Sequence, residues 1–246
     1  MTLANNGDAP DESLAFLLDV DNTLLDNDRF GADLGAHLQL AFGARWRDRY
    51  WEIYEQLREQ SGYADYLGAL QRFRAEFVHA DGGEMPALLR VAHFLLEYPF
   101  ADRLYPHALE TVAHLRTLGN VVIVSDGDIV FQPRKIRRAG IEHAVAGRVL
   151  IFVHKQHCLD AIERYCPASH YVMVEDKPRL LADMKRQWGE RLTTVFVRQG
   201  HYAQDAGQQH IDPAPDRVID GIGELRNCRR ADMLHKSAAR ESTTRA

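Results

Sequence analysis

The 246-residue sequence has little cysteine, no long apolar run and no excess of basic residues. Its cysteines, Cys158, Cys166 and Cys228, are odd in number and form no Cys-x-x-Cys pair, so we expect no disulfide framework. No apolar run approaches the roughly 18 residues that indicate a transmembrane helix. With a net charge of −5 and a pI of about 6.2, the chain offers no basic surface for nucleic acid.

The first residues also lack a secretory signal. Residues 1–12 are polar and acidic, without the basic start and apolar stretch that such a signal needs, and they are typical of a loose leader. We therefore expect a cytoplasmic protein. Apolar residues make up 46% of the chain and charged residues 26%, a balance that allows a sizeable buried core.

Most of the chain alternates between short apolar runs and helical patterns. Such alternation predicts an α/β fold, a Rossmann-like parallel sheet with helices on both faces. Helices are expected at about 156–165 and 178–188, and a frayed helix or a disordered tail is expected beyond about 227. The expected strands are residues 15–18, 121–124, 149–153, 171–174 and 193–197.

One long segment breaks the alternation. Residues 27–100 show only helical spacing, with breaks near Gly43, Gly62 and residues 81–83, and four helices fit. We predict a core domain formed by residues 1–26 and 101–246 and an inserted all-α cap domain formed by residues 27–100. Because this insertion leaves the core just after the first strand, it is placed to act as a lid over the residues at the end of that strand.

Polar chemistry begins where the first strand ends. Asp19, Asp21 and Thr23 follow it as Asp-x-Asp-x-Thr, at the edge where open α/β sheets bind ligands. In an extended segment, residues i and i+2 point the same way, so Asp19 and Asp21 should converge unless the chain turns between them. One carboxylate can then attack a substrate while the other handles protons.

Three further strand ends bring polar side chains to the same edge. The carboxylates gathered at this edge need positive charge to balance them. A hard cation such as Mg²⁺, which prefers oxygen ligands, would provide it. A hydroxyl, a lysine and the backbone N–H groups around a glycine would suit an anionic phosphate. Lys177 is an alternative to Lys155 as the lysine that would contact the phosphate. The residues are Ser125-Asp126-Gly127 after the second strand, Lys155 after the third and Glu175-Asp176 after the fourth.

These four motifs, in this order and each behind a predicted strand, resemble the haloacid dehalogenase superfamily in its phosphatase branch. The resemblance implies that Asp19 is the nucleophile and Asp21 the general acid and base. It implies that Mg²⁺ is held by the carboxylates of Asp19, Glu175 and Asp176 and by the backbone carbonyl of Asp21. The substrate phosphate would then be bound by Thr23, Ser125, Asp126, Gly127 and Lys155.

The sequence therefore predicts a Mg²⁺-dependent phosphatase that hydrolyses a small phosphorylated metabolite through an aspartyl phosphate. Neither nucleic acid nor a membrane is an expected partner. Three alternatives stay open: a phosphomutase built on the same core, a dehalogenase, and a non-catalytic phosphate-binding module. The dehalogenase branch resembles this sequence but lacks the second aspartate. The identity of the substrate and the oligomeric state do not follow from the residues.

Overall fold

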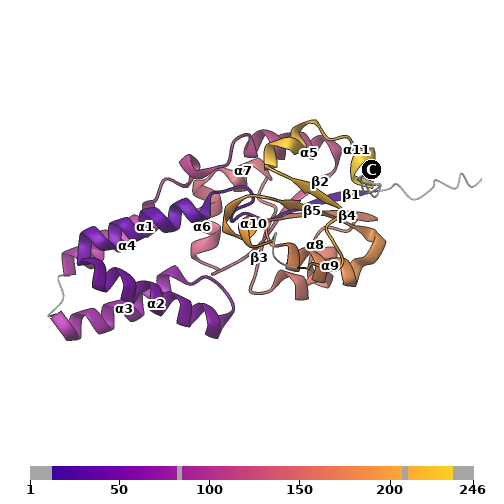
Figure 1. Ribbon diagram of the computed structural model, residues 1–246. Helices are drawn as coiled ribbons and strands as arrows, with labels where there is room; N and C mark the ends of the chain where they lie inside the picture. The colour runs from indigo at the N-terminus through magenta and orange to yellow at the C-terminus, as the bar shows by residue number, and fades with distance from the viewer. Residues whose placement is uncertain (1–12, 82–84, 207–209, 235–246) are drawn as a thin grey trace, which may run out of the picture.

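A computed structural model describes residues 13–81, 85–206 and 210–234. Its centre is a six-stranded, fully parallel sheet in the order β3-β2-β1-β4-β5-β6, which confirms the predicted Rossmann-like α/β class (Figure 1). β1 lies in the interior of the sheet, between β2 and β4. The strands are β1 (Leu14–Leu18), β2 (Asn120–Asp126), β3 (Val149–Phe152), β4 (His170–Glu175), β5 (Leu192–Val197) and β6 (Arg217–Ile219).

Two apolar cores cover the two faces of the sheet because alternate strand residues point in opposite directions. Phe16 and Leu18 of β1 belong to the larger core, whereas Ala15 and Leu17 belong to the smaller one. The larger core includes side chains from α5 (Ala108–Leu118), α6 (Phe131–Arg138), α7 (Ile141–Ala144) and α11 (Arg230–Leu234). The smaller core is completed by α8 (Leu159–Tyr165) and α9 (Pro178–Trp188).

Some elements differ from the sequence prediction. The strand β6 was not predicted; it has only three residues and lies at the edge, so it gives almost no periodic signal. The helix expected at 156–165 is divided into a 3-10 turn, η2 (Lys155–His157), and α8. Beyond residue 227 a short helix, α11, is formed, while residues 235–246, like the expected leader at 1–12, lie outside the described residues.

The helical insertion, residues 27–100, contains four helices that extend away from the sheet (Figure 1). Aromatic side chains fill the space between them; Trp46, for example, meets Phe73 and Phe77 edge to face. The division into a core and a cap domain stays a prediction. The helices are α1 (Asn27–Phe42), α2 (Ala44–Ser61), α3 (Tyr66–Asp81) and α4 (Met85–Glu97).

The two chain segments that join the helical insertion to the sheet run side by side. Leu25 and Leu104 form an antiparallel bridge. The N–H of Asp26 donates to the carbonyl of Arg103 at 2.7 Å, and the N–H of Tyr105 donates to the carbonyl of Leu24 at 2.9 Å. The insertion therefore leaves and re-enters the core through one paired junction. Among the described residues, no helix has both the length and the apolar character that a membrane crossing requires.

Candidate active site

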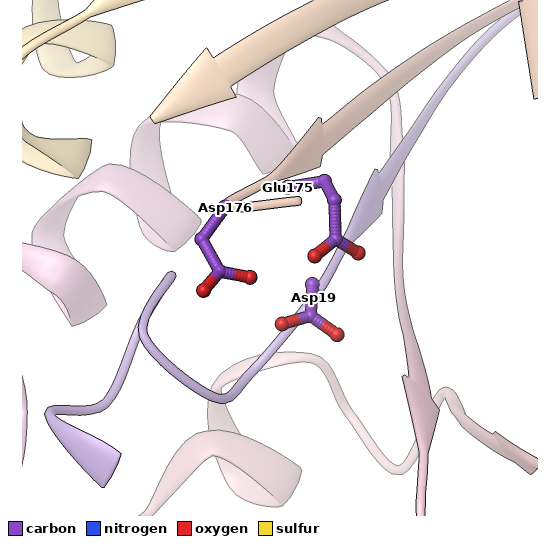
Figure 2. Close-up of side chains that lie close together, drawn as sticks. All are labelled: Asp19, Glu175 and Asp176. Carbon is purple, nitrogen blue, oxygen red and sulfur yellow. The ribbon is translucent and has the colours of Figure 1, made fainter. Parts of the chain in front are cut away.

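Three buried carboxylates meet at the carboxyl edge of the sheet. Asp19 directly follows β1, and Glu175 and Asp176 stand at the end of β4, the strand paired with β1. Each offers an oxygen within 4.8 Å of the oxygens of the other two. Figure 2 shows the three side chains lying close together at the ends of the two strands. The pairing of β1 with β4 is what brings residues 156 positions apart in sequence into one cluster.

The cluster has more acceptor oxygens than donors. Oδ2 of Asp19 and both carboxylate oxygens of Asp176 are buried without a hydrogen-bond partner among the described residues. Burial, together with the charge of Glu175, raises the pKa of Asp19 to about 7 and raises the pKa of Asp176 well above its usual range. Orphaned oxygens of this kind fit a hard divalent cation, which would supply the missing positive charge.

Lys155 supplies positive charge to the cluster. Its fully buried ammonium group donates to Oδ1 of Asp19, lies 2.5 Å from Oε2 of Glu175 and donates to the carbonyl of Val124 at 3.2 Å. Burial alone would lower the pKa of Lys155, but the carboxylates of Asp19, Glu175 and Asp126 raise it above its usual range. Burial would likewise raise the pKa of Glu175, yet the charge of Lys155 holds it below its usual range.

The competing lysine, Lys177, is placed differently. Its side chain lines the cavity in front of the cluster, and its ammonium group lies 5.4 Å from the ring centroid of Tyr202. Its backbone N–H donates to Oε1 of Glu175 at 3.1 Å. Lys155 is therefore the lysine that contacts the nucleophile candidate Asp19, which favours it for the third motif.

The second motif, Ser125-Asp126-Gly127, lies at the end of β2, where this strand pairs with β3. Ser125 is buried, and its Oγ accepts a hydrogen bond from Nε2 of Gln132 at 2.9 Å. Asp126 lines the cavity and accepts from the N–H of Lys155 at 2.8 Å; burial raises the pKa of its carboxyl group.

Two predicted phosphate ligands are placed less favourably. The N–H of Gly127 donates to the carbonyl of Phe152 at 2.9 Å, so this group is not free for phosphate in the structure. The strand β2 runs to Asp126, two residues beyond its predicted end at residue 124. A Cβ at this glycine would lie 3.0 Å from the side chain of Gln132. Thr23 is buried outside the cavity, with its hydroxyl unpaired among the described residues.

Asp21 stands apart from the carboxylate cluster because the chain turns sharply after β1. The N–H groups of Leu24 and Leu25 both donate to the carbonyl of Val20, at 2.9 and 3.0 Å. The carboxylate of Asp21 faces the cavity and is held by two side chains of α6. The ammonium group of Lys135 donates to both of its oxygens, at 2.7 and 2.9 Å, and Nε2 of Gln132 donates to Oδ2 at 3.2 Å.

The cavity has a volume of about 300 Å³ and lies between the sheet edge and the helical insertion. Tyr54, Arg58 and Tyr63 reach it from the insertion. The guanidinium group of Arg58 donates to the hydroxyl of Tyr202 at 3.1 Å and so links the two sides of the cavity lining. From the sheet side it is lined by Asp21, Asn22, Asp126, Gln156, Asp176, Lys177, Leu180, His201 and Tyr202.

Three residues of the site were not predicted from the sequence: Gln132 and Lys135, which contact Asp21, and Arg58, which lines the cavity. Gln132 and Lys135 are three apart on one helix, and positions so spaced share a face. Their neighbours Phe131 and Ile136 are buried. The available signal was a lysine beside apolar residues on one helix face, which indicates burial but not a role in an active site. Arg58 gave no such signal, because arginines are frequent on the exposed side of helices.

The comparisons with known proteins come from sequence and from solved structures. The profile of the haloacid dehalogenase-like hydrolases matches residues 14–182. A haloacid dehalogenase-like hydrolase from Burkholderia xenovorans LB400 is 53% identical, with a TM-score of 0.81 over 89% of this chain and 100% of that one. A search of curated proteins gave no match.

Two more distant structures share the fold. The hydrolase YfnB from Bacillus subtilis, solved bound to magnesium, is 16% identical, with a TM-score of 0.55 over 87% of this chain and 97% of that one. The L-2-haloacid dehalogenase of Xanthobacter autotrophicus is 22% identical, with a TM-score of 0.51 over 86% of this chain and 96% of that one. The profile match and the 53% identity together establish that this chain belongs to the haloacid dehalogenase-like hydrolases.

Proposed function

We propose that the protein is a phosphatase that hydrolyses a small phosphate monoester through an aspartyl phosphate on Asp19. The observation that carries the proposal is the presence of two differently placed carboxylates. Asp19 is buried among the acids and beside Lys155, whereas Asp21 faces the cavity in which a leaving group would lie. This separation suits one group that bonds to phosphorus and another that transfers a proton.

In the first half-reaction, an Asp19 oxygen attacks phosphorus and the ester oxygen leaves with a proton from Asp21. In the second, Asp21 takes a proton from the water that cleaves the aspartyl phosphate, and inorganic phosphate is released. Lys155 is positioned to stabilise negative charge on the transferring phosphoryl group. Ser125, buried at the end of β2, would contribute its hydroxyl to the same group. The ester portion would occupy the cavity near Tyr63 and Arg58.

Asp19, Glu175 and Asp176 would hold a divalent cation, which we propose is Mg²⁺. Their unpaired buried oxygens support this ligand set, as does the magnesium bound to the related fold of YfnB. When bound, such an ion neutralises charge on the phosphoryl oxygens.

Dehalogenation is the competing activity, because L-2-haloacid dehalogenases share the fold. Cleavage of a carbon–halogen bond needs no proton for the leaving halide. A second carboxylate at the cavity, held in place by the donors of α6, therefore supports phosphate ester hydrolysis over halide release.

The test compares p-nitrophenyl phosphate with 2-chloropropionate as substrates, each with Mg²⁺ and with EDTA. We expect Mg²⁺-dependent release of nitrophenol and inorganic phosphate, no release of chloride, and loss of turnover in Asp19→Asn. Chloride release without phosphatase activity would identify a dehalogenase. Phosphoryl transfer to a sugar without net phosphate release would identify a mutase, and phosphate binding without turnover would identify a binding module.

A further inference from the structure

Lys135 lies outside the predicted motifs, yet its ammonium group is bound closely within the active-site region. The side chain is 1% exposed. Its three N–H groups meet three acceptors: both oxygens of Asp21, at 2.7 and 2.9 Å, and Oδ1 of Asn27 at 2.9 Å. Because a lysine ammonium has three donors and no acceptor, these contacts complete its hydrogen bonding.

Aromatic rings surround the same ammonium group. The centroids of Phe30, Tyr66, Phe100 and Phe131 lie between 5.8 and 6.0 Å from Nζ of Lys135. Ring faces attract a cation at this distance. A buried charge needs an ionic partner, and Asp21 is that partner. The ammonium group is therefore fixed in place, and so is the carboxylate that it binds.

Gln132, one turn earlier on α6, adds a second attachment. Its Nε2 donates both to Oδ2 of Asp21, at 3.2 Å, and to Oγ of Ser125, at 2.9 Å. The orientation of the Asp21 carboxylate is thus set by donors from one helix, and the same amide links it to the end of β2. Asn27, the third acceptor of Lys135, is the first residue of α1, so the contact also reaches the start of the helical insertion.

We propose that Lys135 is a positioning residue for Asp21: it holds the carboxylate at the angle from which a proton reaches the leaving oxygen in the cavity. The proposal rests on the phosphatase function proposed above. Proton transfer requires hydrogen-bond distance and alignment, and a displacement of about 1 Å can cost roughly 100-fold in rate. Without Lys135 the Asp21 side chain would stay at the cavity but would be held by Gln132 alone, and the steps in which it gives or takes a proton would slow.

The test therefore uses two esters of similar shape whose leaving groups differ in basicity. Phenolate needs a proton to leave, whereas p-nitrophenolate does not. In Lys135→Met, which keeps an unbranched apolar chain among the rings, we expect kcat/KM for phenyl phosphate to fall roughly 10- to 100-fold more than kcat/KM for p-nitrophenyl phosphate. The control is Arg137→Met on the same helix, whose side chain is 75% exposed; it should leave both values unchanged.

A double-mutant cycle separates positioning from a structural role. If Lys135 acts through Asp21, the variant Asp21→Asn/Lys135→Met should be no slower on phenyl phosphate than Asp21→Asn alone. Equal losses on the two esters in Lys135→Met, or losses that multiply in the double variant, would overturn the proposal. Gln132→Leu removes the second attachment and should show the same selective loss, so it serves if Lys135→Met does not fold.

The behaviour of the unaltered protein keeps the two proposals distinguishable. Mg²⁺-dependent hydrolysis of p-nitrophenyl phosphate that is lost in Asp19→Asn supports the phosphatase function whatever Lys135→Met does. An unaltered protein that hydrolyses neither ester would overturn the phosphatase function, and the role of Lys135 with it. A working enzyme without the selective loss would overturn only the role of Lys135.

Discussion

Replacing Asp176 by Asn should make the metal-free protein more stable, although the residue lies in the candidate active site. Asp176 is buried with both carboxylate oxygens unpaired among the described residues. The three acids bring oxygens within 4.8 Å of one another, and two unit charges at that distance repel by about 3 kcal/mol at an effective dielectric constant of about 20. Proton uptake would relieve the repulsion, but it has a cost of its own at neutral pH.

The direction of this change in stability follows from the raised pKa of Asp176. A carboxyl group whose pKa is higher in the folded state than in the unfolded chain destabilises the fold at every pH above its unfolded value. An amide has no such penalty. We therefore expect a gain of about 2–3 kcal/mol for Asp176→Asn in EDTA at pH 7.5, or roughly 4–10 °C in Tm, and little gain near pH 4.

Mg²⁺ should remove most of this difference in stability between Asp176→Asn and the unaltered protein. A ligand at about 100 times its Kd stabilises the native state by about 2.7 kcal/mol, and Asp176→Asn should lose most of this effect. Thermal unfolding followed by circular dichroism, in EDTA and in Mg²⁺, measures both quantities. The control is Asp183→Asn on α9, whose exposed carboxylate pairs with Arg186. A lower Tm of Asp176→Asn in EDTA, or an equal Mg²⁺-induced shift in the variant and the unaltered protein, would refute the reasoning.

Three further outcomes are expected. In EDTA the unfolding free energy should fall as pH rises from about 4 to 7, because folded Asp19 retains a proton that the unfolded chain has lost; urea titrations should show a smaller fall in Asp19→Asn. Asp21→Asn should lower stability by about 3 kcal/mol by leaving the charge of Lys135 unpaired, and adding Lys135→Met should restore most of it, as urea unfolding would show. Arg58→Ala should change the order of kcat/KM over a panel of phosphorylated metabolites, because Arg58 lines the cavity. The control Arg72→Ala, exposed on α3 outside the cavity, should not; identical changes in the two variants would show that Arg58 does not determine substrate preference.

The sequence predicted the parts of the fold that rest on local patterns. The parallel sheet followed from buried apolar runs, and the positions of Asp19 and Glu175 followed from the rule that parallel strands end at one edge. These residues come from neighbouring strands, so knowing where each strand ends was enough to bring them together. The strand β6 was not predicted because three residues are too few to show the alternation of apolar and polar residues that indicates a strand.

The contacts of Asp21 depended on tertiary structure. Extended geometry predicts that Asp19 and Asp21 point the same way, but the turn at Val20–Leu25 changes the course of the chain between strand and helix. Lys135 reaches Asp21 only because α6 packs against that turn, 114 residues away in the sequence. A lysine on a helix is ordinarily solvated, so no local rule assigns it to an active site. The use of the Gly127 N–H in the sheet depended equally on the register between β2 and β3.

The paired junction between Leu25 and Leu104 has an evolutionary consequence. An insertion whose ends already lie within hydrogen-bond reach adds no strain to the sheet, and the entropy of closing such a loop changes only slowly with its length. Helices can therefore be gained, lost or exchanged between these two points while the strands keep their register. In the phosphatase proposed above, selection can therefore alter the helices that line the cavity without rebuilding the sheet edge that carries Asp19.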